Sequence, residues 1–212
     1  MKAIPTLITE RVDDIPLLRE QRQRMGLPTV FDPHVPTHGT WAGLSLGWGS
    51  TIWLRAIVSR GEHRMVHVAP WVAKRLGTLG ATTGQAVPRG DCTADRREIV
   101  LRPWSDDERW SACEAALNPH PVRVDALATE RGHVESTSAS VSATGRNNGL
   151  LQCGPSKDDR PDVPQGTVMQ AVLEPVGMPL ATEVVSGARA DAPLSLPCIA
   201  RVQASVGRRG LL

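Results

Sequence analysis

A carboxylate and a basic loop are the residues best suited to chemistry in this sequence. Glu135 lies in a short segment of strand character, residues 133–136, where a strand would deliver the acid to the edge of a sheet. The segment 157–162 is charged and is closed by two prolines, which predicts a fixed polar loop. Lys157 and Arg160 in this loop suit contacts with phosphate groups, and the simpler alternative is a solvated loop held by its prolines.

Other ionisable residues have simpler explanations. Asp191 follows Arg-Ala at the expected mouth of a helix, where the helix dipole favours an acid. His63 and His67 are spaced like metal ligands on a helix, but no HExxH pattern surrounds them, so a surface or packing role is favoured. His34 and His38 have the same spacing in a proline-rich segment, where it carries no helical meaning.

Hydrolase chemistry is not indicated either. The serines of the segment 136–140 offer hydroxyl groups, but the nearest histidine, His133, has no orienting acid in the sequence pattern. A serine hydrolase is therefore disfavoured.

The second half of the chain has the pattern of three strands and a helix. Short apolar runs predict strands at 133–136, 167–173 and 180–185, with a Gly-Met-Pro turn at 177–179 between the last two. Residues 193–206 have apolar side chains at helical spacing despite an internal proline. A further short strand is expected at 122–124 and a loop at 136–148.

The first half of the chain predicts helices. Asp14 and Pro16 mark a helix start, glycines at 26, 61 and 77 mark helix ends, and Ser105 to Glu108 has the pattern of a capping box. The predicted helices cover 17–25, 43–60, 70–76 and 105–117, and loops are expected at 32–40 and 77–93. The fold class is therefore α+β, with a helical N-terminal domain at 1–118 and a second domain at 119–212.

Composition narrows the class of protein. No apolar run is long enough to span a membrane, and the N-terminus lacks the apolar core of a signal peptide, so a cytoplasmic location is expected. The four cysteines have neither zinc-site nor disulfide spacing. All six tryptophans lie in the first 110 residues, and the helical spacing of Trp48 and Trp53 favours core packing over stacking on bases. The net charge of +2 does not by itself announce a nucleic-acid binder.

Four motifs in the second half resemble those of the DDE transposases of bacterial insertion sequences. The motifs are Val-Glu-Ser-Thr at 134–137, Ser-Lys-Asp-x-Arg-Pro-Asp-x-Pro-Gln at 156–165, Gly-Met-Pro-Leu at 177–180 and Val-Val-Ser-Gly-x-Arg-Ala-Asp at 184–191. Segments at 11–16, 36–39, 43–47, 67–71 and 101–110 also resemble the N-terminal region of that family. The resemblance therefore extends over nearly the whole chain.

The resemblance implies a DNA-binding N-terminal domain followed by an RNase H-like nuclease domain. Such enzymes cut and join DNA at insertion-sequence ends with two Mg²⁺ ions held by carboxylates. Glu135 occupies the place of the family's first metal-holding acid, and Lys157 and Arg160 are expected to contact DNA. The implied partners are DNA and either a second copy or a full-length transposase, which places the protein at the nucleoid.

Two departures from the family pattern argue against catalysis. The family has aspartate where this chain has Glu135, and an error near 1 Å in such a site can cost about 100-fold in rate. The family's second acid follows a fourth strand that would begin at Leu211, so the expectation is an RNase H-like domain truncated at that strand, with Mg²⁺ not held stably. The alternatives are an inactive transposase remnant and a DNA-end-binding inhibitor of an intact transposase.

Overall fold

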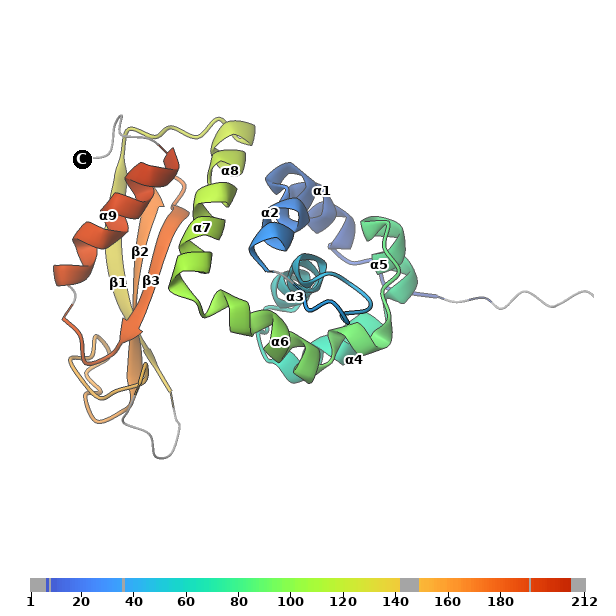
Figure 1. Ribbon diagram of the computed structural model, residues 1–212, viewed down its shortest axis with the longest axis horizontal. Coiled ribbons are helices and arrows are strands. Elements are labelled where there is room, and N and C mark those ends of the chain that lie inside the picture. Colours follow the sequence, from blue (N-terminus) through green and yellow to red (C-terminus); the bar gives the residue numbers. More distant parts are fainter. Residues whose placement is uncertain (1–6, 8, 36, 142–148, 191, 207–212) are drawn as a thin grey trace, which may run out of the picture. The chain divides into compact units, whose positions relative to one another are not determined.

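The computed structural model describes residues 7, 9–35, 37–141, 149–190 and 192–206. It is a mixed α+β protein with a three-stranded antiparallel sheet (Figure 1). The chain divides into two compact units, Met1–Cys113 (the N-terminal unit) and Glu114–Leu212 (the C-terminal unit). The elements are α1 Ile15–Met25, α2 Leu27–His34, α3 Leu46–Arg60, η1 Met65–His67, α4 Val68–Ala73, α5 Leu76–Thr83, η2 Arg89–Cys92, α6 Ala94–Trp104, α7 Asp107–Leu117, α8 Pro119–Val124, β1 Gly132–Ser140, β2 Gln165–Leu173, β3 Met178–Ser186 and α9 Ala192–Val206.

Glycines end two helices of the N-terminal unit as the sequence predicts. Gly26 follows α1 and Gly61 follows α3, both in the left-handed conformation that glycine adopts without steric cost. α3 begins after Ser45, whose hydroxyl accepts a hydrogen bond from the Trp48 backbone N–H. Trp48 and Trp53 pack against the buried core of this unit, which includes Ile15, Ile52, Trp71, Val72 and Leu79.

Helix α5 corrects two predictions, the helix end at Gly77 and the loop at 77–93. Gly77 lies in the first turn of α5, and the carboxylate of Glu10 caps this turn. The Glu10 oxygens accept hydrogen bonds from the backbone N–H groups of Gly77 and Thr78 at 2.9 and 2.6 Å, and these bonds hold the pKa of Glu10 below its usual range. The helix is therefore started by a side chain 67 residues away, which the local pattern does not reveal.

Other predictions in this half are wrong in detail. The expected loop at 32–40 overlaps α2, which accommodates Pro33 near its end, and α6 was not predicted. α7 is capped by Asp106 instead of Ser105: the Asp106 carboxylate accepts from the Arg109 N–H at 2.9 Å, whereas the Ser105 hydroxyl donates to the Arg102 carbonyl.

The C-terminal unit has the predicted three strands and helix, with longer strands than expected. The strand order is β1-β2-β3, and both neighbouring pairs are antiparallel. β1 continues to Ser140, so the loop expected from 136 onward begins later, and residues 142–148 lie outside the described residues. The strand expected at 122–124 is wrong because Pro119 opens the short helix α8 there.

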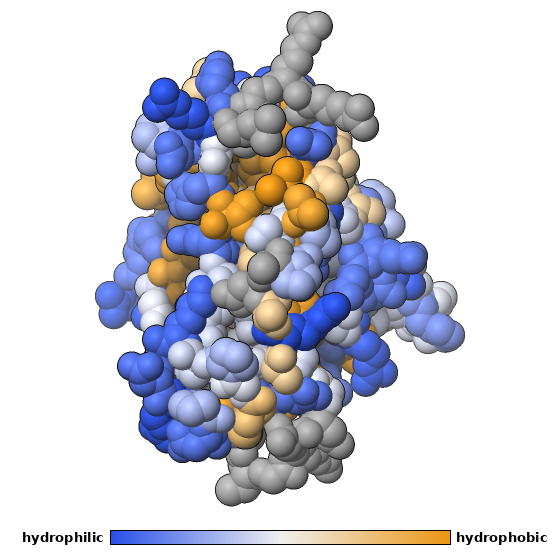
Figure 2. All heavy atoms as spheres, turned by 90° about the vertical axis from the view of Figure 1, so that its left-hand side faces the viewer, coloured by the Kyte–Doolittle hydropathy of each residue, from blue (hydrophilic) through white to orange (hydrophobic). Residues whose placement is uncertain are grey.

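Helix α9 covers one face of the sheet. Leu194, Cys198 and Val202 project from it into a core with Met169 and Leu180 of the sheet. A hollow of about 310 Å³ lies between α9 and β1 and is lined almost wholly by apolar atoms. Figure 2 looks toward this side of the unit and shows apolar residues, in orange, among the hydrophilic ones.

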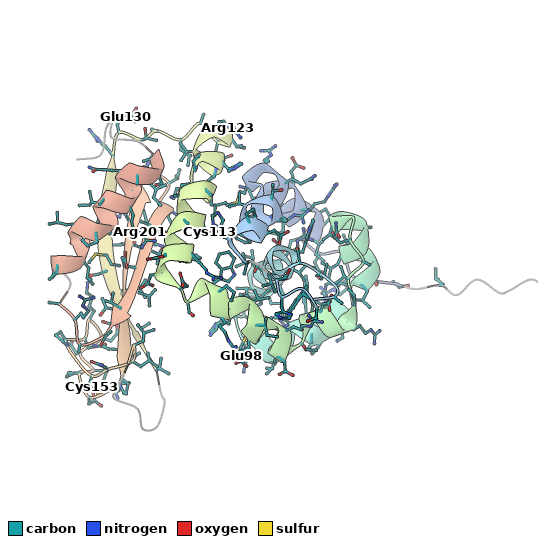
Figure 3. The ribbon with its side chains drawn as sticks, viewed as in Figure 1. Glu98, Cys113, Arg123, Glu130, Cys153 and Arg201 are labelled. Atoms are coloured by element: carbon teal, nitrogen blue, oxygen red, sulfur yellow. The ribbon has the colours of Figure 1, made fainter. Side chains whose placement is uncertain are left out.

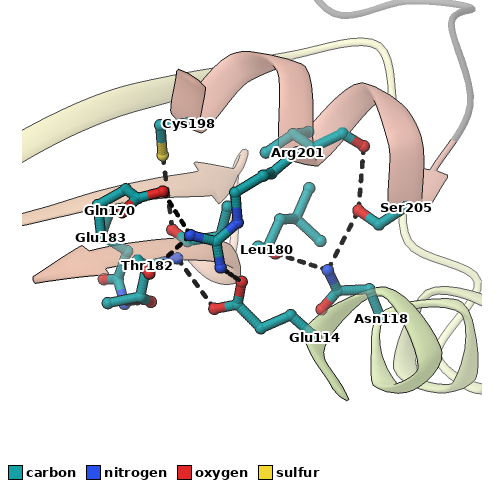
Figure 4. A network of polar contacts seen from close by, with 11 residues as sticks. Glu114, Asn118, Gln170, Leu180, Thr182, Glu183, Cys198, Arg201 and Ser205 are labelled. Atoms are coloured by element: carbon teal, nitrogen blue, oxygen red, sulfur yellow. Dashed lines mark hydrogen bonds and ion pairs between the residues drawn. The ribbon is translucent and has the colours of Figure 1, made fainter. Parts of the chain in front are cut away.

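Side chains from helices occupy the outer edge of β3 (Figure 4). The Glu114 carboxylate accepts from the Thr182 backbone N–H at 2.9 Å, and the Asn118 amide donates to the Leu180 carbonyl at 2.6 Å. Arg201 of α9 donates to the Thr182 carbonyl at 3.2 Å and forms ion pairs with Glu114 and Glu183. These contacts tie α7, α9 and β3 into one polar network, and Arg201 lies between α9 and β3 (Figure 3).

No helix among the described residues combines the length and apolar character that a membrane crossing requires.

Candidate functional site

Glu135 lies in a polar row that crosses the sheet. Its side chain is exposed on β1, and its cross-strand partner is Gln170 on β2, whose own partner is Thr182 on β3. Paired residues in antiparallel strands project from the same face, so the three side chains form a row. The Gln170 amide donates to the Thr182 hydroxyl at 3.4 Å, which leaves the Glu135 carboxylate at the β1 end of the row.

Lys157 anchors the loop between β1 and β2 to β1. Its ammonium group donates to the backbone carbonyl of Ser136 at 2.6 Å and also contacts the Ser136 hydroxyl. Its backbone N–H donates to the Ser138 hydroxyl at 3.4 Å. The sequence-predicted cation therefore lies against the residue that follows Glu135, along the outer edge of β1.

Arg160 forms an exposed ion pair within the same loop. Its guanidinium donates to both carboxylate oxygens of Asp162, at 3.1 and 3.2 Å. The hydrogen bond to Arg160 holds the pKa of Asp162 below its usual range, and the same contact raises the pKa of Arg160. Exposed pairs of this kind are weak, so a phosphate could replace Asp162 as the partner.

Gln165 fixes the loop to the end of the sheet. It is fully buried, and its amide donates to the carbonyls of Gly154 and Pro155 at 3.1 and 2.6 Å. Gly187, just after β3, has its α-carbon so close that an added Cβ would lie 2.2 Å from the Gln165 carbonyl oxygen. Cys153, labelled in Figure 3, belongs to this loop at the end of the sheet where β2 begins. The local sequence gives no signal for the role of Gln165 beyond its place next to a strand.

Metal ligands do not assemble among the described residues. No three His, Cys, Asp or Glu side chains lie close enough there to share an ion, and Asp191 lies outside the described residues. Leu211, the expected start of a fourth strand, also lies outside the described residues.

Two of the histidines singled out in the sequence, His67 and His38, have contacts nearby in the chain, and His133 lies 3.2 Å from the Glu174 carboxylate, an acid that the sequence pattern did not reveal. His67 lies 3.7 Å from the Glu62 carboxylate. Hydrogen bonds from Arg64 lower the pKa of Glu62 to about 2. His38 contacts the Thr40 hydroxyl at 2.9 Å. These contacts favour the surface role over a metal site.

Comparisons with family models, with curated proteins and with solved structures found no match to this chain.

Proposed function

We propose that this chain is a transposase-type protein that binds insertion-sequence DNA, with an RNase H-like C-terminal unit. The main support for this proposal is that residues of separate motifs lie in contact. Gln165 of the second motif is buried against Gly187 of the fourth. Lys157 of the second motif contacts Ser136 of the first. Contacts between motifs that are separate in the sequence support a common origin for them. The order of strand, loop, hairpin and covering helix supports the same proposal.

In this proposal Glu135 takes the place of the first metal-holding acid. Its exposed carboxylate suits an oxygen ligand for Mg²⁺, but its side chain is one methylene longer than the family's aspartate. The described residues supply no cluster of acids around it. Strand cleavage is therefore not part of the proposed activity.

Plasmid nicking tests this part of the proposal. The full chain with Mg²⁺ or Mn²⁺ is expected to nick supercoiled DNA no faster than its Glu135→Ala variant, because the extra methylene misplaces the ligand and such errors cost about 100-fold in rate. Turnover of the wild-type chain that the Glu135→Ala variant lacks would contradict the inactive assignment and make Glu135 a metal ligand.

DNA binding is proposed to use Lys157 and Arg160. Each is a loop cation with a replaceable internal partner, Ser136 for Lys157 and Asp162 for Arg160. A phosphate that displaced these partners would gain a charge-assisted hydrogen bond. Because the internal contacts must first be released, each cation is expected to add modestly to affinity.

Gel-shift titration at several salt concentrations tests the DNA contacts. Lys157→Gln and Arg160→Gln are each expected to reduce the slope of log affinity against log salt by about 1, because each removes one phosphate contact. Arg123→Gln, the same charge change on exposed α8, is the control and should leave the slope unchanged. Affinity that ignores salt and both loop variants would contradict the proposal.

A second candidate is a DNA-end-binding inhibitor of an intact transposase. It would compete with that transposase for element-end DNA or form a mixed dimer with it. The longer acid at Glu135 favours it, since binding without cleavage is what an inhibitor requires. Gel-shift titration with element-end DNA and a nicking assay with added active transposase separate the candidates. The inhibitor binds element ends and slows the added transposase, whereas a remnant without a role does neither.

A further inference from the structure

Three buried arginines of the N-terminal unit form no ion pair with a described residue, and one of them, Arg97, donates instead to the backbone carbonyls of Cys92 and Met65. Arg22 is 6% exposed and Arg55 is 4% exposed, and neither forms an ion pair with a described residue. By contrast, buried Arg75 donates to the Asp13 carboxylate at 2.6 Å. Burying a charge is costly unless it is paired, so these two side chains call for another explanation.

Arg22 is the more incomplete of the two. Its Nε and Nη1 atoms are buried and have no hydrogen-bond partner among the described residues. Its guanidinium lies over the Trp48 ring, 4.3 Å from the ring centroid. Trp48 therefore holds the guanidinium in place, while two of its nitrogens lack an acceptor among the described residues.

Arg22 also lines a cavity of about 300 Å³, together with Trp48, Gly26, Pro28 and Thr29. The volume is at the small end of the range for ligand sites, which favours a compact ligand over an extended one.

The start of helix α2 also lines this cavity. Gly26 is its N-cap residue and offers no side-chain cap. The first backbone N–H groups of a helix have no acceptor within the helix, and the helix dipole makes this end partly positive. In α2 the first-turn N–H groups belong to Leu27 and Thr29, because Pro28 has none. An anion in the cavity would thus meet both a guanidinium and a helix N-terminus, two groups that bind phosphate.

Two charged side chains line the cavity, Arg22 and Asp32. The Asp32 oxygens accept hydrogen bonds from the Ser45 hydroxyl at 2.9 Å and the Gly47 N–H at 2.8 Å. With Asp32 engaged by these donors, Arg22 is the charged lining residue that is left to meet an anion.

We propose that this cavity binds a phosphate group, held by the Arg22 guanidinium and the first turn of α2. The group could come from inorganic phosphate or from a phosphoester, which share the oxyanion that the site recognises. The proposal rests on the N-terminal unit alone and does not depend on the proposed DNA-binding function.

The test compares the full chain with two arginine variants from the same helix. Arg22→Met keeps the apolar stem and removes the charge, and Arg24→Met does the same at an exposed position paired with Glu20. In chloride, Arg22→Met is expected to melt at or above the wild-type temperature, because it removes an unpaired buried charge. The Arg22→Met variant is therefore expected to fold, unlike a variant that leaves a cavity in the core.

Two readouts report binding at constant ionic strength. Inorganic phosphate at tenfold excess over its Kd is expected to raise the tryptophan-monitored Tm of wild type and Arg24→Met by on the order of 5 °C more than that of Arg22→Met. The difference between variants removes the general stabilisation that phosphate gives to all proteins. In ³¹P NMR, wild type and Arg24→Met should broaden the phosphate resonance and Arg22→Met should not.

Equal Tm shifts and equal line broadening in all three proteins would overturn the proposal. A parallel titration with a short DNA duplex distinguishes the sources of phosphate. If the duplex displaces inorganic phosphate from wild type, the site accepts backbone phosphate, and if it does not, the site takes small phosphates. Both of these results require the Arg22-dependent phosphate signal, so the site stands or falls separately from DNA binding.

Discussion

Replacing Arg201 with methionine is expected to lower the free energy of unfolding of the C-terminal unit by about 3 kcal/mol. Arg201 lies between two carboxylates: its Nη1 is 2.6 Å from Glu183, and its Nη2 contacts Glu114. The three side chains are only 13–22% exposed. Removal of the cation leaves two acids close together in a poorly solvated place, which costs more than the loss of the bonds themselves.

The placement of the tryptophans makes this prediction easy to measure. All six lie in the N-terminal unit, so tryptophan fluorescence reports that unit, whereas far-UV circular dichroism also reports the sheet and α9. Urea unfolding of Arg201→Met should shift the dichroism transition and leave the fluorescence transition nearly unchanged. Amide exchange at Thr182, whose N–H is bonded to Glu114, should accelerate.

A triple variant provides the control. Glu114→Gln and Glu183→Gln added to Arg201→Met remove the charges together, and most of the lost stability is expected to return, because neutral groups are cheaper to bury than unpaired ions. If the free energy of unfolding of Arg201→Met lies within about 0.5 kcal/mol of the wild-type value, the network contributes no more than an exposed surface ion pair.

Replacing Gly187 with alanine is expected to cost about 3 kcal/mol and to release the loop from the sheet. A Cβ at this position would lie 2.2 Å from the Gln165 carbonyl oxygen and 2.7 Å from that of Gln152. Both are backbone atoms, so the clash cannot be relieved by turning a side chain. The loop has to move away, and with it the Gln165 amide bonds and Lys157.

Gly166→Ala is the matched control for this change. Gly166 is buried in the adjacent strand, but its added Cβ would meet its nearest atom at 3.7 Å, an ordinary contact. Alanine in a strand interior is favoured over glycine, so Gly166→Ala should be neutral or slightly stabilising. Denaturation followed by circular dichroism, with limited proteolysis of the loop, compares the two variants. A Gly187→Ala protein that is as stable and as resistant to proteolysis as Gly166→Ala would contradict the close packing of the Gln165 and Gln152 carbonyls against Gly187.

Sequence patterns predicted the elements whose signals are local. Gly26 and Gly61 end helices because their left-handed conformation suits only glycine well, and this requirement is visible in the sequence itself. The apolar runs at 167–173 and 180–185 became β2 and β3, because short apolar runs of strand length are themselves a local strand signal. α9 was predicted despite Pro197, since Leu194, Cys198 and Val202 keep their helical spacing around it.

The elements that were missed depend on distant contacts. Glu10 caps the N–H groups of Gly77 and Thr78 in the first turn of α5, and no window of local sequence contains both the cap and the helix. At 122–124 the β-branched residues suggested a strand, but Pro119 at the helix start decided for α8. Tertiary contacts and proline geometry outweighed intrinsic propensity in both cases.

The candidate site was predicted only in part. Glu135 was expected on a strand and lies exposed on β1, and Lys157 and Arg160 were expected on a loop and lie there. The ties that hold this loop were not foreseen, because a buried glutamine amide and two closely approaching glycine backbones leave no composition signal. The phosphate-sized cavity beside Arg22 was missed for the same reason: the burial of an arginine is a property of the fold.

The side chains along β3 set a limit on how this sheet can associate. Glu114, Asn118 and Arg201 satisfy the outward carbonyl of Leu180 and the outward N–H and carbonyl of Thr182, so this stretch of β3 offers no template to an incoming strand. At the opposite edge, a strand from another chain would have to displace Lys157 from the Ser136 carbonyl of β1. Unlimited growth of a sheet from many chains requires two open edges on each chain, and these side chains oppose it at both edges.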